Sequence, residues 1–361
     1  MAHRSDPDAI SGPYDPDPDA EEDLWFLPAP PDPDASPADL PWAGPSRPGW
    51  DLRVPTWATA EAALAGDLAR AALALGALDE RVRTGPAGLR QRLVCAEVAE
   101  LSWHLGDRVT VDRLALYLVL RLAAVGEDAA ALARAAWAVR RLDRGGAADL
   151  SDLAAFLGRS LRDTLPDADL ATRPVGTEFD ALARDWEAEL ADAAGQHPLT
   201  RSALAWHGWR RRGLSGDAAL LEGAVTAARI GAEALRPGGL GFVPVALGGN
   251  SPLIEGGSAR ARLAAWLRAV EQAALRGLME ADRLSRWEAE ARTRTASMSG
   301  RIPAQLLAAL LAWPLVSAPM LEAETGASRA AVQRNMNRFQ DLGLVQEVTG
   351  QARFRYWRLA L

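Results

Sequence analysis

The sequence predicts a mainly α-helical protein: a multi-helix body followed by a C-terminal winged helix-turn-helix with a short β-hairpin. Three observations support this prediction. Apolar residues recur at helical spacing between about 56 and 298. Beyond 299, three helix-like segments precede an alternating strand pattern. Residues 1–50 contain too little apolar surface to fold alone. We therefore expect a disordered leader (1–50), a helical body (51–298) and a winged helix-turn-helix (299–361).

The leader is strongly acidic. Residues 1–50 hold eleven Asp and Glu against two Arg, and repeated Asp-Pro pairs disfavour helix. Because the whole chain has a formal charge of −7, the remaining residues carry a small positive balance. The acidity of the chain is thus a property of the leader. We expect either a solvated leader or one that competes with a ligand for basic residues near the C-terminus.

The body should consist almost entirely of helices separated by Gly and Pro clusters. An unstructured connection is expected at 162–175, and a Gly/Pro loop at 237–257. We expect the last body segment, 258–297, to be one long helix or a pair broken near Gly277. Its second half should be charged on all sides. The other expected helices span 56–83, 89–105, 111–125, 127–142, 150–161, 177–194, 199–212 and 217–235.

The C-terminal module has local signals for two closely spaced helices. Ser317 is placed to cap the first of them. Gly326 supplies a turn, because a residue without Cβ crosses positive φ at little cost. Ser328 then caps a second helix over 329–341, and Gly343 marks its end.

The second helix has two unlike faces. Val332, Met336 and Phe339 recur at i, i+4 and i+7, so this side must pack against a core. The opposite face carries only charged and amide side chains: Arg329, Gln333, Arg334, Asn337, Arg338 and Gln340. A hairpin follows, with strands near 344–348 and 353–358, from which we expect Arg353 and Arg355 to project.

These residue types indicate a nucleic-acid ligand. Residues 329–361 hold six Arg against two acidic residues. Arg binds guanine or phosphate, and Gln or Asn binds adenine, so such a helix fits the major groove of double-stranded DNA. A solvated face, or one that binds protein, would have the same composition. The residues expected to contact DNA are Ser328, Arg329, Gln333, Arg334, Asn337, Arg338, Arg353 and Arg355.

Few residues suit catalysis or a cofactor. The four His do not form a metal-ligand motif, and we expect no cofactor. The single cysteine, Cys95, lies within a helix and should be a buried, inert thiol. Glu97, with Glu100 and His104, should belong to a solvated helix face. The glycines at 238–250 could hold phosphate through backbone amides, but an ordinary loop is favoured since no lysine follows.

No stretch reaches the ~18 uninterrupted apolar residues that a membrane span requires. No signal-like segment opens the chain, and the basic residues are all Arg, which is typical of GC-rich bacterial genes. We therefore expect a bacterial cytoplasmic protein. A homodimer formed through the helical body would strengthen the binding of so small a DNA-binding module.

The run from Pro314 to Trp357 resembles the winged helix at the C-terminus of many Fic-type proteins. The segment LVCAEVAELSWHLGDRVTVDRLAL (93–116) is similar to the N-terminal helix and turn of a bacterial family with a Fic-like helical body. This resemblance implies a Fic-like body and a DNA-binding module. His197-Pro198 lacks the Gly-Asn-Gly-Arg of the Fic catalytic loop, and Leu105 replaces the inhibitory-helix Glu before Gly106. The resemblance therefore argues against nucleotidyl transfer.

Two other functions are compatible with the sequence. The body could transfer a nucleotide or phosphate group through a non-standard site, for which 238–250 is the expected phosphate loop. The C-terminal module could instead belong to a scaffold that binds a protein partner.

Overall fold

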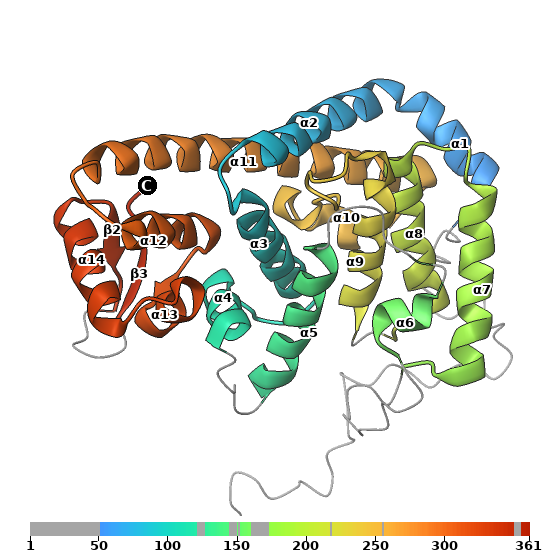
Figure 1. The fold of residues 1–361 in the computed structure, drawn as a ribbon. Coiled ribbons are helices and arrows are strands. Elements are labelled where there is room, and N and C mark those ends of the chain that lie inside the picture. The colour runs from blue at the N-terminus through green and yellow to red at the C-terminus, as the bar shows by residue number, and fades with distance from the viewer. Residues whose placement is uncertain are drawn as a thin grey trace, which may run out of the picture. The chain divides into compact units, whose positions relative to one another are not determined.

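The computed structural model describes residues 51–120, 127–143, 150, 152–159, 173–216, 219–254, 256–349 and 355–361. The predicted leader lies outside these residues. Trp50–Leu361 forms one compact unit. Its described part is mainly helical, with a small antiparallel sheet near the C-terminus, which confirms the predicted fold class (Figure 1). The boundary between body and module at 298/299 stays a prediction.

The described body contains eleven α-helices and two 3₁₀ turns. The predicted helix at 56–83 is in fact two helices that meet at Leu64, and parts of three other predicted helices lie outside the described residues. The elements are α1 (Val54–Ala63), α2 (Ala65–Thr84), α3 (Leu89–His104), α4 (Val111–Leu120), α5 (Glu127–Leu142), α6 (Leu153–Leu157), α7 (Gly176–Asp192), α8 (Pro198–Arg212), α9 (Leu220–Gly231), η3 (Ala232–Ala234), η4 (Ala246–Gly248), α10 (Ser251–Ile254) and α11 (Ala259–Arg294).

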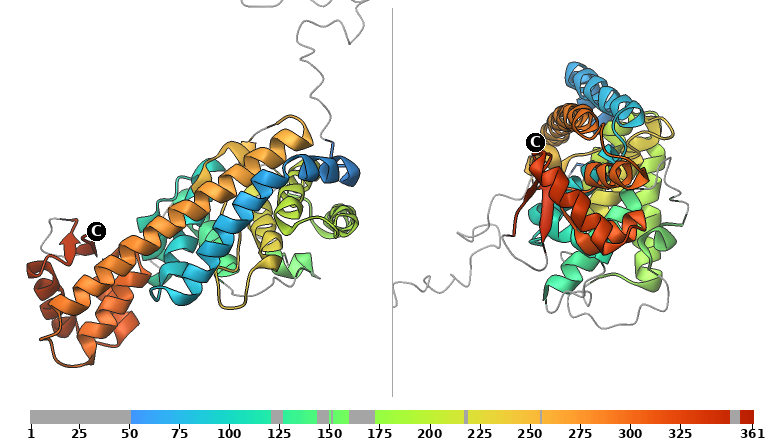
Figure 2. Two further views of the ribbon diagram at one scale, coloured as in Figure 1. Left: turned by 90° about the horizontal axis from the view of Figure 1, so that it is seen from above. Right: turned by 60° about the vertical axis from the view of Figure 1, so that its left-hand side comes forward.

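Helix α11 is continuous through Gly277 and runs beside α2 (Figures 1 and 2). A Cβ atom at Gly277 would lie 2.8 Å from both Cδ atoms of Leu78 on α2. Glycine therefore serves here to let two helices approach closely and does not break the helix.

The second half of α11 is not charged on all sides as predicted. Ala281, Leu284, Trp287 and Ala291 are buried and lie at helical spacing. The charged residues between them occupy the remaining surface, so this half of α11 is an ordinary amphipathic helix. Its apolar stripe packs toward the C-terminal module, because the Trp287 indole donates a hydrogen bond to the Leu344 carbonyl oxygen at 2.9 Å.

The C-terminal module contains α12 (Arg301–Ala312), β1 (Val316–Ser317), α13 (Ala318–Thr325), α14 (Arg329–Asp341), β2 (Val345–Glu347) and β3 (Tyr356–Leu359). The predicted hairpin is present: β2 pairs with β3, with Val345 opposite Leu359. Strand β1 was not predicted, and it pairs with the other edge of β3 to give the sheet order β1-β3-β2. The segment 350–354 between the hairpin strands lies outside the described residues.

A buried arginine joins α3 of the body to α12 of the module. Arg92 is 8% exposed. Its guanidinium donates hydrogen bonds to the carbonyl oxygens of Leu310, Leu311 and Trp313, at 2.8, 2.6 and 2.7 Å. These carbonyls end α12 and have no partner within the helix, so the cation caps it. The module is thus attached to the body through buried polar contacts as well as a shared core.

Candidate nucleic-acid interface

Two caps and one turn position helix α14. Ser317 accepts a hydrogen bond from the Met320 amide at the start of α13. Gly326 ends α13 with φ of +66°, a conformation that favours glycine. Ser328 accepts a hydrogen bond from the Ala331 amide at 3.4 Å and caps α14. All three predicted signals are confirmed, because each depends on residues close together in the chain.

The predicted division of α14 into two faces is also confirmed. Val332, Met336 and Phe339 are fully buried, at 0% exposure. The opposite side faces solvent, and Gln333 at its edge is half-buried. The exposed predicted side chains on α14 and at its cap are Ser328, Arg329, Arg334, Asn337 and Arg338, joined by Gln340.

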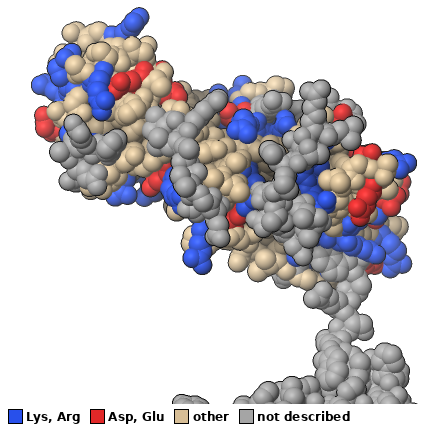
Figure 3. Space-filling model, turned by 90° about the horizontal axis from the view of Figure 1, so that it is seen from below, with Lys and Arg blue, Asp and Glu red and all other residues tan. Residues whose placement is uncertain are grey.

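The exposed arginines of α14 are available to a ligand. Within the described part of the chain, Arg334 and Arg338 form no ion pair or side-chain hydrogen bond, and Arg329 lies 3.9 Å from Glu322. In Figure 3, basic side chains gather on the lobe at the upper left, which contains this module, with a few acidic ones among them. This surface attracts an anion, and the arginine guanidinium can form paired hydrogen bonds with phosphate as well as with carboxylate.

The amide side chains of α14 are held in a network with Arg355 of the hairpin. The Gln333 amide nitrogen donates to Oδ1 of Asn337 at 2.9 Å. The Arg355 guanidinium donates to the same Oδ1 at 3.4 Å and to Oε1 of Gln340 at 3.1 Å. The helix face and the hairpin are thus joined before any ligand arrives.

Arg355 therefore lies differently from the predicted projecting position. Side chains alternate along a strand, and Arg355 shares its side with the buried Trp357 and Leu359. Its guanidinium lies 5.3 Å from the Trp357 ring centre and 3.5 Å from the Glu347 carboxylate. Arg358, on the other side of the strand, is exposed. Arg353, the other predicted hairpin contact, lies outside the described residues.

Residues 238–250 form a loop, as predicted. The carboxylates of Asp79 and Glu97 accept hydrogen bonds from backbone amides in this loop and just before it. Asp79 accepts hydrogen bonds from the amides of Arg236 and Leu240. Glu97 accepts from the amides of Val245 and Ala246, both at 2.8 Å, and of Leu247 at 3.0 Å. These five backbone amides are thus already bonded to side chains of the protein itself.

The prediction that Glu97 belongs to a solvated helix face is wrong. Its side chain is 1% exposed, because η4 covers this part of α3. Burial raises the pKa of Glu97 to about 7, while the three amide hydrogen bonds act in the opposite direction. Cys95, two residues earlier, is buried as predicted, and burial raises the pKa of its thiol to about 12.

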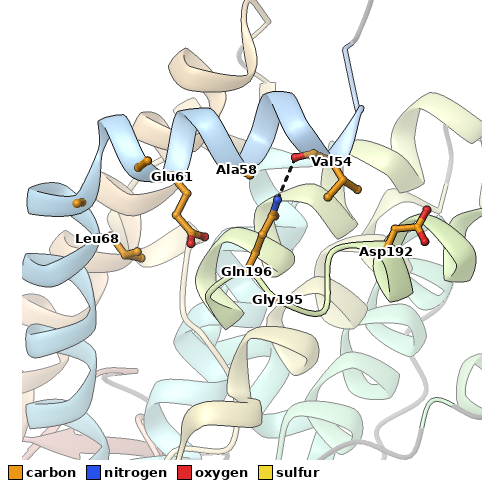
Figure 4. Close-up of a pocket in the computed structure, with 9 residues that line it drawn as sticks. Val54, Ala58, Glu61, Leu68, Asp192, Gly195 and Gln196 are labelled. Atoms are coloured by element: carbon orange, nitrogen blue, oxygen red, sulfur yellow. Dashed lines mark hydrogen bonds between the residues drawn. The ribbon is translucent and has the colours of Figure 1, made fainter.

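A cavity of about 410 Å³ lies between α1 and the turn that joins α7 to α8 (Figure 4). The Gln196 amide crosses it to donate to the Val54 carbonyl oxygen at 3.1 Å. The nine lining residues include the carboxylates of Glu61 and Asp192 and no basic side chain. This lining repels phosphate, so the cavity does not suit a nucleotide. In the described residues, no cluster of His, Cys, Asp and Glu is arranged to hold a metal ion.

Comparison with known protein families identifies one match. Residues 303–359 match the family described as HTH DNA binding domain, a range that runs from α12 to the end of β3. No curated protein sequence matches the chain. The C-terminal module thus has the helices and the sequence of a helix-turn-helix DNA-binding domain. The match does not extend into the body, so the resemblance of the body to Fic-type proteins stays a prediction. Among the described helices, none has the length and apolar character needed to span a bilayer.

Proposed function

We propose that this protein regulates transcription by binding double-stranded DNA, with α14 in the major groove and the hairpin β2–β3 as a wing on the backbone. The observation that carries this proposal is the outward face of α14. It places Arg334, Asn337 and Arg338 in solvent, on a helix whose other side is fully buried. The family match of residues 303–359 supports DNA as the partner.

The size of the module favours binding as a dimer. A single helix-turn-helix buries only about 600–1,000 Å² on DNA, which gives modest affinity. A homodimer formed through the helical body would double this contact and would select a palindromic site with half-sites one helical turn apart. The buried Arg92 contacts support a body that holds α14 in one orientation, as this spacing requires.

We propose that the body is a structural support for the module and not a nucleotide-transferring enzyme. The amides of the 238–250 loop are bound to Asp79 and Glu97, and the acidic lining of the cavity does not favour phosphate. Binding of labelled nucleotide by the full chain, unaffected by competing DNA, would contradict this part of the proposal.

The test is selection of duplexes from a random pool by the full chain, followed by titration of a selected site. Arg334→Ala should weaken binding, because a phosphate or guanine contact is lost. Asn337→Ala should affect base preference at one position more than overall affinity. The free-energy difference between the preferred and the other bases at that position should fall by about 1–3 kcal/mol. Lack of enrichment, or identical behaviour of both variants and the wild type, would exclude α14 as the reading helix.

A further inference from the structure

The amide network between α14 and β3 has a consequence for base recognition. We propose that Arg355 holds Asn337 and Gln340 with their amide nitrogens outward, so that the centre of α14 reads guanine in preference to adenine. This inference rests on the proposed DNA-binding function and specifies the base class that the same helix recognises.

The orientation of both amides follows from the chemistry of the guanidinium group. Arginine has only donors, so any amide atom that hydrogen-bonds to it must be the carbonyl oxygen. Arg355 therefore fixes Oδ1 of Asn337 and Oε1 of Gln340 toward the hairpin. Oδ1 of Asn337 also accepts from Gln333, so both of its lone pairs are used. The Asn337 amide nitrogen donates to no atom in the described residues, and its side chain is exposed.

An asparagine held in this way cannot recognise adenine by the usual bidentate pair. That pair needs a side-chain oxygen to accept from adenine N6 and a nitrogen to donate to N7. Asn337 offers only the nitrogen. Guanine presents two acceptors, N7 and O6, to the major groove and so matches a group that only donates.

The position of Asn337 places its side chain near the middle of the exposed face of α14, where it can contact a base in the major groove. At 100° per residue, Asn337 lies on the side of α14 opposite the buried line of Val332 and Phe339. Arg334, one turn earlier, is exposed and also has only donors. Asn337 and Arg334 thus lie next to each other and both present only hydrogen-bond donors to the bases. We therefore expect a guanine-rich half-site.

The network is built into the folded protein and does not need DNA to form. Arg355 is held between the Glu347 carboxylate and the Trp357 ring, and its side chain is only 25% exposed. Since these contacts keep the guanidinium in place, the two amide oxygens stay occupied when the helix meets a base. Arg355 is therefore a positioning residue that acts through Asn337.

The test uses the full chain and two variants of the hairpin. Arg355→Met keeps an apolar stem over Trp357 and removes the guanidinium that donates to both amides, so that only Gln333 still donates to Asn337. Arg358→Ala is the matched control, because Arg358 is exposed on β3, carries the same charge and makes no contact with the amides. Duplexes are selected from a random pool with each protein, and Asn337→Ala identifies the base position that Asn337 reads.

We expect wild-type protein to select guanine at that position. Arg355→Met should shift the ratio of adenine to guanine there by about tenfold toward adenine, whereas Arg358→Ala should leave the ratio unchanged. Adenine in the wild-type site, or an unchanged ratio in folded Arg355→Met, would overturn the inference and leave DNA binding intact. Failure of wild-type protein to enrich any duplex would instead overturn the proposed function, and this inference with it.

A second measurement does not depend on the folding of a variant. Replacing the selected guanine by 7-deazaguanine removes only the N7 acceptor from the duplex. Wild-type protein should then bind about tenfold more weakly, as expected for loss of a specific base contact. Unchanged affinity on this duplex would show that Asn337 does not donate to N7 and would overturn the inference.

Discussion

Replacing Arg92 by leucine should destabilise the protein far more than the same replacement of Arg90 on the same helix. The guanidinium donates three short hydrogen bonds to carbonyls at the end of α12, and it is almost entirely buried. Burial lowers the pKa of Arg92 to about 10, so the group is charged at neutral pH. A hydrogen bond to a charged group contributes about 1.5–3 kcal/mol. Because one cation serves all three carbonyls, the contributions are not additive, and we expect a total loss of about 3–5 kcal/mol.

Urea unfolding followed by tryptophan fluorescence and by far-ultraviolet circular dichroism measures this loss. Arg90→Leu is the control, since Arg90 lies on the same helix and forms only a partly exposed contact with Asp143 at 3.7 Å. It should change the free energy of unfolding by less than about 1 kcal/mol. Equal effects of the two substitutions would refute the role of Arg92 as the cap that joins the body to the module.

Three further predictions concern other parts of the chain. Because burial raises the pKa of Glu97 to about 7 from 4.5, the folded state binds this proton more tightly than the unfolded state. Its contribution to stability is therefore complete below 4.5 and is lost as pH rises through 7, and Glu97→Gln should flatten that dependence in urea titrations. The Cys95 thiol should resist maleimide in the native protein and react after denaturation, and rapid native labelling would contradict its burial. Arg358→Ala should reduce the slope of log affinity against log salt by about one, because one phosphate contact of the wing is lost.

The parts of the fold that follow from nearby residues could be predicted from the sequence. Ser317, Gly326 and Ser328 act on amides or turns within a few positions of themselves, and all three were identified. The apolar spacing of Val332 and Phe339 likewise determined which side of α14 would be buried. The exposed face of the candidate interface was therefore predictable in both composition and direction.

The contacts between distant segments could not be predicted. Glu97 was assigned to a solvated face because its three amide partners lie about 150 positions further along the chain. Strand β1 has only two residues, too few for a recognisable alternation. Arg355 was expected to project, yet its two-residue spacing from the buried Trp357 already placed it on the inner side of the hairpin. The inward position of Arg355 could therefore have been predicted from the sequence. Its hydrogen bond to Asn337 could not, because the two residues belong to different elements.

The most direct test of the central claim is to map where bound DNA touches the protein. A selected duplex that carries photoreactive 5-iodouracil can be cross-linked to the full chain, and the modified peptides can be identified by mass spectrometry. The outward face of α14 should carry cross-links between 329 and 341, with further ones on the hairpin. Cross-links confined to the helical body, with none in the C-terminal module, would contradict the account.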